Sequence, residues 1–507
     1  MTPVSSSRLA AIALLSALAA SSARGNLILV FPNGDDIDPN GNCTLREAVE
    51  AAQTDLAVDA CPAGSAGEAD VVQLAWGDYP LTLGEIHVGP GELIVRGAVT
   101  PPRSVVAADG AFRLFYMHPG AAVSFEGLDL ASGEARDTGE QDTGGAVRSL
   151  DASLGLRDVE VRGNVAVAGG GLYFSAHGAQ TLHVERSRIR DNRAAKETPV
   201  GQATGGGVYV ALGGTATARF VDSEISANHA QSNQSGDPVY AGGLYASLTG
   251  EARLELERVE LLGNRGWAGS ASGAAYGAGA IALVNDQASL RIRDARFFQN
   301  LVPIGSAFSV TALQVQASIA AEVELQRIHF AENDSGQPYR GVYLSAFETA
   351  KIRATNLLVA DGPASGLLAF SSGEAAVDLG HLTVTGHSAT GLFLSCDEIA
   401  HLQLDNSIVW DNVTEVTQFG PVVAGPSNLI DVDPLFVDPL AGDWSLLPAS
   451  SAIGHGDRTL VSVDRLDLAH APRTAGTETD AGAYEFGSIF GDDFESGDAG
   501  AWSASAP

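Results

Sequence analysis

Short runs in which apolar and polar residues alternate recur along the chain. Each predicts a β-strand, because successive side chains of a strand point to opposite faces. Residues 253–259, Arg-Leu-Glu-Leu-Glu-Arg-Val, are a clear case. A second pattern, an apolar residue followed three positions later by Asn, recurs in register with these runs. Its Asn residues are Asn164, Asn192, Asn228, Asn264, Asn300, Asn333 and, after two positions taken by Gly362 and His387, Asn412. The successive spacings of 28, 36, 36, 36, 33, 29, 25 and 25 residues indicate a structural repeat.

Glycines keep phase with this series. Glycine pairs or triplets at 144–145, 169–171, 205–207 and 242–243 each precede a short apolar stretch. Each repeat therefore predicts a glycine turn, a strand, a turn, a second strand and an Asn corner, followed by a loop of variable length. No repeat shows a helical pattern and none can bury its apolar face alone, so we expect a solenoid of stacked parallel strands.

The longest repeats carry their extra residues between the Asn and the Gly signals, at 194–204, 229–241 and 265–276. This places the insertions on one side of the solenoid. Asn tolerates left-handed backbone, and amides stacked one above another can hydrogen bond in a ladder. We expect such a corner ladder, and the alternative is a row of amides that bind a ligand.

Composition agrees with one elongated domain with caps. The 507 residues include 59 Gly, and 45 % are apolar, which supports a sizeable core rather than disorder. The 61 Asp and Glu outnumber the 29 Lys and Arg, so the formal charge is −32. A surface this acidic disfavours nucleic acids and anionic membranes as partners.

Residues 1–23 predict a secretory signal peptide, with Arg8 before a mostly apolar run at 9–20 and small residues at 21–23. That run is shorter than the roughly 20 residues of a membrane-spanning helix, and we expect no transmembrane segment in the mature chain. Export permits disulfides. We expect Cys43 to pair with Cys61, the alternative being that both are reduced and buried, and we expect Cys396 in the core.

Residues 43–52, Cys-Thr-Leu-Arg-Glu-Ala-Val-Glu-Ala-Ala, with Cys61 downstream, closely resemble the CSLREA motif of secreted bacterial proteins. The paired Gly-Gly and Asn signals are similar to the repeats of polymorphic outer membrane proteins. Residues 433–448 and 480–485 resemble the choice-of-anchor C-terminal region of such proteins. The resemblance implies an all-β fold, a right-handed parallel β-helix of the pectin-lyase-like type. It also implies a protein that is secreted from, or displayed on, a Gram-negative bacterium.

The expected solenoid has about ten coils and a short N-terminal capping helix. The expected division is a signal peptide at 1–23, a CSLREA-like cap with the first strands at 24–110, β-helix repeats at 111–425, a choice-of-anchor-like cap at 426–486 and an acidic tail at 487–507.

One motif suggests a metal. The residues from Asp36 to Glu47 fit the calcium-loop pattern D-x-[DN]-x-[DN]-G-x5-E. Its candidate ligands are Asp36, Asp38, Asn40, the Asn42 carbonyl and Glu47. The alternative is a polar turn leading into a helix capped by Thr44 and Glu47. Calcium is the one cofactor that the sequence suggests.

Charged residues also fall on strand-like runs: Arg157, Asp158, Arg190, Asp191, Arg291, Arg293 and Asp294. They predict either a solvated face with cross-strand pairs or a groove that contacts glycans together with Trp267, Tyr240 and Tyr276. No nucleophile–base signature and no pair of carboxylates suited to glycoside cleavage is visible, so no catalytic residue is assigned.

The sequence therefore favours a monomeric, exported or surface-displayed binding protein without enzymatic activity. Its expected partner is an extracellular glycan or a host or cell-surface protein. The alternatives are a polysaccharide lyase or glycoside hydrolase with a pectate-lyase-like fold, and a structural component of the cell surface.

Overall fold

The computed structural model describes residues 25–98, 101–110, 112–135, 142–196, 202–232, 237–268, 274–303, 310–334, 340–363, 365–460, 465–473 and 478–487. The signal peptide expected at 1–23 lies outside the described residues. So does all but the first residue of the tail expected at 487–507.

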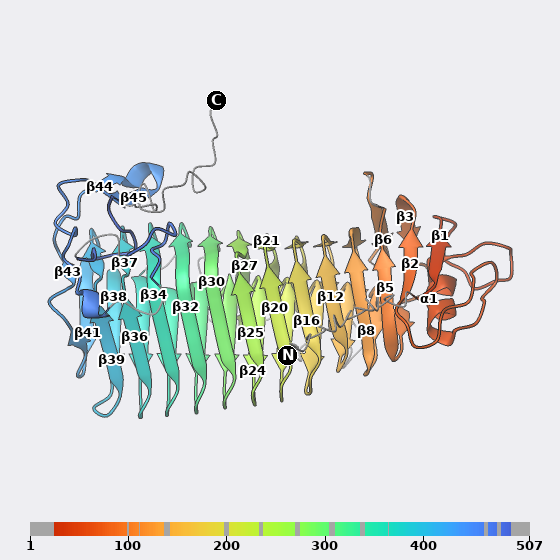
Figure 1. The fold of residues 1–507 in the computed structure, drawn as a ribbon, viewed down its shortest axis with the longest axis horizontal. Coiled ribbons are helices and arrows are strands. Elements are labelled where there is room, and N and C mark those ends of the chain that lie inside the picture. Colours follow the sequence, from red (N-terminus) through yellow and green to blue (C-terminus); the bar gives the residue numbers. More distant parts are fainter. Residues whose placement is uncertain are drawn as a thin grey trace, which may run out of the picture.

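The described chain is an elongated solenoid of parallel strands, with its N-terminal coils at one end and its C-terminal coils at the other (Figure 1). A 24-stranded sheet contains two rows of strands, and a 12-stranded sheet forms a third row. All pairings between named strands are parallel except that of β44 with β45 in the C-terminal region. The predicted fold class, an all-β parallel β-helix with a short N-terminal helix, is confirmed.

The first row consists of β1 (Leu27–Val30), β2 (Asp70–Leu74), β5 (Gly91–Arg96), β8 (Ala121–Glu126), β12 (Ser153–Arg157), β16 (Thr181–Glu185), β20 (Thr217–Val221), β25 (Arg253–Glu257), β36 (Ala376–Gly380), β39 (His401–Asp405) and β42 (Val423–Ala424). Three long strands belong to both the first and second rows: β30 (Ser289–Phe298), β32 (Glu322–Ala331) and β34 (Lys351–Ala360). The remaining strands of the second row are β3 (Gly77–Pro80), β6 (Ser104–Ala107), β9 (Leu128–Ala131), β13 (Glu160–Arg162), β17 (Arg188–Arg190), β21 (Glu224–Ser226), β26 (Glu260–Leu262), β37 (Thr383–Thr385), β40 (Ile408–Trp410) and β43 (Leu429–Ile430).

The third row consists of β4 (Ile86–Val88), β7 (Phe115–Met117), β11 (Val147–Leu150), β15 (Leu172–Ala176), β19 (Val208–Leu212), β24 (Leu244–Leu248), β29 (Ala280–Val284), β31 (Val310–Ala317), β33 (Arg340–Ala346), β35 (Ser365–Ser371), β38 (Thr390–Cys396) and β41 (Thr414–Phe419). Its twelve strands exceed the ten or so coils expected. The coil number was underestimated because the first coils lack the Asn signal.

The insertions of the long coils form a separate flange on one side, as predicted. It contains β10 (Glu134–Ala135), β14 (Val165–Ala166), β18 (Arg193–Lys196), β22 (His229–Ser232) and β27 (Arg265–Ala268) in one small sheet, and β23 (Val239–Tyr240) with β28 (Ala275–Tyr276) in another. Small side chains such as Ala194, Ala230 and Val239 form the flange's own core.

Alternate residues of every coil point inward and stack between neighbouring coils. Phe125, Leu156, Val184 and Phe220 occupy equivalent inward positions of successive first-row strands and are at most 1 % exposed. Burying such side chains contributes about 1.5–3 kcal/mol each, and stacking is what makes this burial available to coils that cannot fold alone. Cys396 is free and buried at the end of β38, as expected.

The Asn corner ladder is confirmed, but the left-handed backbone expected at its Asn residues is not. The positive φ falls on the residue before each Asn, for example 55° at Asp191 and 60° at Gly263. The Asn192 side chain donates its amide hydrogens to Asn228 Oδ1 at 3.0 Å and to the Val161 carbonyl at 2.9 Å. Its own oxygen accepts from the Asn164 amide at 2.9 Å. The pattern repeats through Asn228, Asn264, Asn300 and Asn333, all at most 5 % exposed. These amides are bonded within the solenoid, so the alternative of a ligand-binding row is wrong.

Gly362 interrupts the ladder, and beyond it the corner is rebuilt differently. His387 Nε2 lies 3.2 Å from the Val359 carbonyl, an equivalent position to the earlier Asn amides, and Asn412 Oδ1 accepts from the His387 backbone. The glycine signal keeps phase with the ladder for a steric reason. A Cβ on Gly207 would lie 2.9 Å from Cγ of Asn228, and Gly171, Gly243 and Gly279 face their Asn amides almost as closely, so these coils favour glycine. Ala146 and Ala312 take the equivalent position in two other coils.

The two ends are closed differently. At the N-terminal end α1 (Leu45–Thr54) packs its buried residues against the first coils. Stacking already begins at β1, inside the range expected to be a cap. At the other end the chain after β43 folds back along the second row (Figure 1). It contains β44 (Phe436–Asp438), η1 (Pro439–Ala441), β45 (Asp443–Leu446) and η2 (Arg458–Leu460). We call residues 465–473 and 478–487 of this region the C-terminal strap.

No helix in the described ranges combines the length and apolar character needed to span a lipid bilayer.

Candidate functional site

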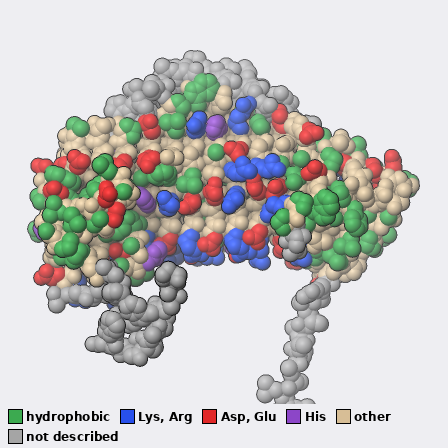
Figure 2. Space-filling view, turned by 90° about the horizontal axis from the view of Figure 1, so that it is seen from above, with side chains coloured by type: hydrophobic (Ala, Val, Ile, Leu, Met, Phe, Trp, Pro, Cys, Tyr) green, Lys and Arg blue, Asp and Glu red, His purple; other side chains and the backbone are tan. Residues whose placement is uncertain are grey.

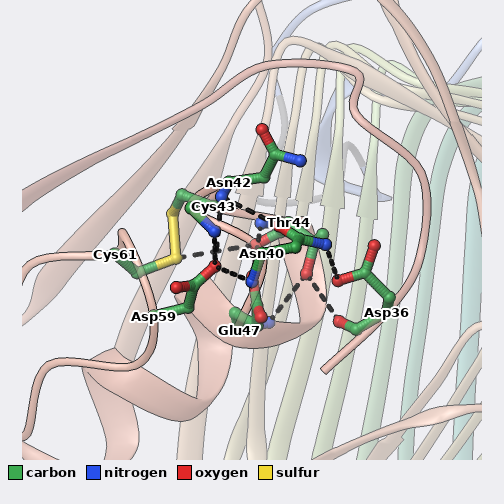
Figure 3. Close-up of a disulfide and its surroundings, with 9 residues drawn as sticks. Asp36, Asn40, Asn42, Cys43, Thr44, Glu47, Asp59 and Cys61 are labelled. Carbon is green, nitrogen blue, oxygen red and sulfur yellow. Dashed lines mark hydrogen bonds between the residues drawn. A yellow bond between two sulfur atoms is a disulfide. The ribbon is translucent and has the colours of Figure 1, made fainter. Parts of the chain in front are cut away.

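The proposed calcium loop is organised by its own hydrogen bonds (Figure 3). Glu47 is fully buried, and its Oε2 accepts from the Thr44 backbone at 2.9 Å while Thr44 caps the backbone of Glu47. This capping box starts α1 and removes Glu47 from any ligand set that faces solvent. The alternative stated for this motif, a capped helix start, is therefore what the structure shows.

The other candidate ligands are bonded to the loop itself. The Asn40 side chain donates to Asp36 Oδ1 at 3.1 Å and accepts from the Asn42 backbone at 2.9 Å, while Asp38 is exposed. One oxygen of Asp59 accepts from the backbones of residues 40, 41 and 42 at 2.7–3.1 Å. Within the described ranges, no three His, Cys, Asp or Glu side chains are arranged to hold a metal ion.

Cys43 and Cys61 form the expected disulfide, which joins the start of α1 to the loop that follows the helix. In chain-entropy terms a loop of this size is stabilised by about 3 kcal/mol. The disulfide and the capping box together hold α1 and the loops on either side of it in place.

The outer surface of the central coils is dominated by charge. Figure 2 shows acidic and basic side chains mixed along the middle of the molecule and hydrophobic side chains gathered toward both ends. Residues 142–360 hold 19 of the chain's 29 Lys and Arg but only 21 of its 61 Asp and Glu. The central coils are therefore nearly neutral, and the charge of −32 resides almost entirely in the two ends.

A ladder of alternating charges follows the corner between the first and second rows. We call it the corner ladder of charges, and its members are Asp158, Arg186, Asp222, Arg258, Asp294 and Arg327. All six have φ between 45 and 56°, in the left-handed region. Arg258 donates to both oxygens of Asp222 at 2.6 and 3.1 Å, and Arg186 and Arg327 do the same to Asp158 and Asp294.

Neighbouring cationic side chains lower the pKa of two carboxylates in the corner ladder of charges. Hydrogen bonds from Arg258 hold the pKa of Asp222 below its ordinary value. Burial alone would raise the pKa of Asp294, but the bonds from Arg327 and from His470 of the strap outweigh it and the pKa is lowered. These carboxylates are ionised at neutral pH.

Beside this ladder lies an elongated groove of about 900 Å³ on the outer face of β25, β30, β32, β34 and β36. We call it the central groove. Its basic side chains are Arg253, Arg291, Arg293, Lys351 and Arg353, and its acidic ones are Glu251, Glu255, Glu322, Glu324 and Asp378. Since adjacent strands lie about 4.8 Å apart, five strands give a groove about 19 Å long.

Glu324 is the most engaged carboxylate of the central groove. It accepts from Arg291 Nε at 2.6 Å, from Arg293 at 3.2 Å and from Gln326 at 2.6 Å. Burial would raise its pKa, but the bond from Arg291 and the charges of Arg291 and Arg293 leave the pKa below its ordinary value. A lowered pKa is opposite to what the general acid of a glycosidase requires.

Two cations of the central groove differ from the rest. Arg253 and Lys351 are exposed, and within the described part of the chain no ion pair joins either of them to a carboxylate. By contrast, Arg291 and Arg293 are held by Glu324, and Arg353 lies 3.9 Å from Asp378. Arg253 and Lys351 are therefore the groove's available contacts for an anionic group.

A second groove of about 470 Å³ lies on the other side of the corner ladder of charges. It is lined by Arg188, Glu224, Glu260 and Arg296 together with residues of that ladder. In this second groove Arg188 lies 3.8 Å from Glu224, and Arg296 lies 3.3 Å from Glu260.

The sequence candidates divide between these surfaces. Arg291 and Arg293 line the central groove, Asp158 and Asp294 belong to the corner ladder, and Arg157 pairs with Glu185 at 3.3 Å. Arg190 pairs with Glu160 and with Asp191. Both sequence readings therefore hold in part: cross-strand pairs form, and some of the same residues line a groove.

The aromatic candidates lie elsewhere. Trp267 is in β27 of the flange, and Tyr240 stacks on Tyr276 there at 5.2 Å between ring centroids. On the third row Tyr173, Tyr209 and Tyr245 stack at 4.7 and 5.1 Å, so their ring faces are covered by one another. The expectation that Trp267, Tyr240 and Tyr276 share a groove with the arginines is wrong, because the insertions that carry them project from a different face.

Sequence reasoning missed Arg253, Lys351, Arg353 and the acidic side chains of the central groove. The signal was present as charges at alternate positions of neighbouring repeats. It could not be aligned, because the coils have unequal lengths.

Comparison with known proteins adds the following. No protein-family model and no curated protein matches the chain. Among solved structures, the crystal structure of the pectate lyase Pel9A is similar, with a TM-score of 0.41 and 14 % sequence identity over 92 % of this chain and 97 % of that one. The fold assignment rests on the strand pairings described above.

Proposed function

We propose that the protein is an exported or surface-displayed binding protein that holds an extended acidic glycan along the central groove. The observation that carries the proposal is the pair of exposed cations, Arg253 and Lys351, without carboxylate partners in a groove about 19 Å long. A groove of this shape suits a linear polymer better than a compact ligand. The near-neutral charge of the central coils removes the long-range repulsion that a charge of −32 would otherwise exert on a polyanion.

The chemistry of the groove favours binding over cleavage. Glu324 is committed to two arginines, and Asp378 lies within 4 Å of both Arg353 and His401. A glycoside hydrolase needs one carboxyl group with a raised pKa opposite a second carboxylate. The fold itself carries no catalytic meaning, because the same architecture supports unrelated functions.

Binding to immobilised acidic and neutral glycans tests the proposal. We expect the wild-type protein to bind acidic chains and the Arg253→Ala/Lys351→Ala double variant to bind them at least tenfold more weakly. Arg96→Ala is the matched control, since Arg96 is bonded to Glu126 at 2.7 Å outside the groove. Equal binding by the double variant would overturn the proposal.

A second readout separates the enzyme alternatives. Ultraviolet absorbance detects the unsaturated products of a lyase, and a reducing-end assay detects hydrolysis. Turnover of a bound glycan would replace the binding function with a lyase or hydrolase. No binding and no turnover across the panel would favour the structural role.

A further inference from the structure

The outer face of the first row changes character toward the N-terminus. Leu27 and Leu29 lie on the outward side of β1 and are 55 and 53 % exposed, and Phe31, directly after the strand, is 59 % exposed. Trp76, directly before β3, is 64 % exposed. Leu27 pairs with Val71, and Val71 with Ile94, so the apolar surface continues onto the next two strands. We call Leu27, Leu29, Phe31 and Trp76 the apolar patch.

β1 also has a free edge. Within the described ranges it pairs with β2 alone, and its four residues Leu-Ile-Leu-Val include no charge or proline that would block another strand. Natural edge strands are normally protected by such residues or by a covering element. At this end α1 packs on the coil interior, which leaves the outward apolar side of β1 exposed.

The charge around this edge is strongly negative. Residues 25–98 contain twelve Asp and Glu and two Arg, a net charge of −10. Both arginines are bonded to carboxylates, Arg46 to Asp35 at 2.8 Å and Arg96 to Glu126 at 2.7 Å. A partner for this end should therefore carry basic residues, and a second copy of the chain would bring the same negative charge.

The size of the apolar patch also favours a single extended segment over a second copy of the chain. Four side chains that expose more than half their surface amount to an apolar area on the order of 400 Å². A stable dimer buries about 800 Å² on each partner. The apolar patch with one strand edge matches a single extended segment, which gains affinity from main-chain hydrogen bonds and specificity from alternate side chains.

We propose that β1 and the apolar patch receive an extended segment of another protein in which apolar residues alternate with Lys or Arg. The segment pairs with the free edge of β1. Its apolar side chains lie beside Leu27, Leu29 and Trp76, and its basic side chains meet the carboxylates of the cap. This interaction is independent of the central groove.

The test uses the full chain and a synthetic peptide of four Lys-Val repeats. Two control peptides have four Glu-Val repeats, or prolines at alternate positions that cannot pair with a strand edge. We expect the Lys-Val peptide to bind, with a blue shift of indole emission that is lost in Trp76→Phe. Affinity should fall at least tenfold in Leu29→Asp and with rising salt. Leu440→Asp is the control at the other end of the molecule, where Leu440 is fully exposed.

Three results would overturn the proposal. One is equal binding of the proline peptide or of Leu29→Asp. Another is a concentration-dependent dimer in sedimentation that Leu29→Asp dissociates, which would make a second copy the occupant. The third is an emission of Trp76 in the free protein typical of a buried indole, which would mean that the chain itself covers the patch.

Discussion

The corner between the first and second rows carries two kinds of residue in one backbone conformation. From Asp158 to Arg327 the side chains alternate between Asp and Arg and form bidentate pairs. Those from Asp158 to Arg258 are exposed, whereas in the last pair, of Asp294 with Arg327, Arg327 is only 8 % exposed. In the next three coils the equivalent residues are Asn356, His381 and Asn406, with φ of 58, 53 and 50°. These three are at most 1 % exposed, because the C-terminal region lies over them.

The covered residues are bonded to that region. Asn356 accepts from Arg473 Nε at 2.8 Å and donates to the Leu466 carbonyl at 2.7 Å. Asn406 accepts from the Asp457 backbone at 2.7 Å. Arg473 is fully buried and donates to Glu485 at 3.2 Å and to the Gly482 carbonyl at 2.8 Å. Burial lowers the pKa of Arg473 and raises that of Glu485 to about 7.

The left-handed backbone conformation is the same along the whole corner, and the side chains are neutral at Asn356, His381 and Asn406, where the C-terminal region covers them completely. A solvent-exposed ion pair contributes little to the free energy of unfolding. A buried position favours neutral amide and imidazole groups that meet a partner's backbone, because a buried charge without full compensation is expensive. His470 of the strap marks the boundary: it bonds at 2.8 Å to Asp294, the carboxylate of the last, largely covered ion pair.

The largest expected effect is that of removing the buried cation. Arg473→Met should destabilise the C-terminal region by about 3–5 kcal/mol, because Glu485 and Asn356 lose their partner inside the protein. The unfolding of this region can be followed in urea by the emission of Trp444, which is 4 % exposed. A loss below about 1 kcal/mol would contradict the assigned role of Arg473.

The next largest loss of stability is expected from exchanging Asn and Asp between a covered and an exposed corner position. Asn356→Asp replaces the amide that donates to Leu466 with a carboxylate, and it should cost about 1–3 kcal/mol. Asp222→Asn is the reverse change in the exposed stretch and should cost less than about 1 kcal/mol. If both variants lost the same free energy of unfolding in urea, burial under the C-terminal region would not explain why position 356 is Asn.

The pH dependence of the covered region tests the Glu485 assignment. Its folded pKa of about 7 lies above the ordinary value of 4.5, so between these values the folded state holds a proton that the unfolded state releases. The contribution of Glu485 to stability therefore falls as pH rises from 4.5 to 7, by at most about 1.4 kcal/mol per pH unit.

The pKa of buried His381 is lowered and acts in the opposite direction below pH 6.5. The difference between wild type and Glu485→Gln isolates Glu485. That difference should change steadily across the window, and a flat difference would refute the assignment.

The smallest expected effect lies in the exposed stretch. Arg258→Met matches Arg473→Met in its chemical change, but it removes a solvent-exposed pair with Asp222. We expect a loss below about 1 kcal/mol that shrinks further in 1 M salt. A thermal melt at low and high salt measures it, and a loss comparable to that of Arg473→Met would remove the distinction between the two stretches.

The sequence was informative where one residue type repeats for one physical reason. The Asn corner and the glycine that usually faces it recur because the stacked amides bond to one another and leave little room for a Cβ, so the solenoid, the ladder and the flange could be predicted. The disulfide and the capped helix start were also visible as local patterns. The calcium hypothesis stays a prediction, and the same polar residues also satisfy a turn and a helix start, as Asn40 and Glu47 do.

What the sequence did not reveal depends on contacts between coils or between distant segments. Arg in left-handed corner positions carries no composition signal, since Gly, Asn and Asp are the residues usually associated with that conformation. The docking of Arg473 beside Asn356 joins residues 117 positions apart. The central groove required the register of five coils of unequal length.

Affinity for acidic oligosaccharides of increasing length, measured at several salt concentrations, tests the central claim most directly. The account predicts that affinity rises with length until the chain spans the central groove, weakens with salt, and loses both dependences in the Arg253→Ala/Lys351→Ala double variant. An affinity that is independent of length and salt, or unchanged in that variant, would contradict it.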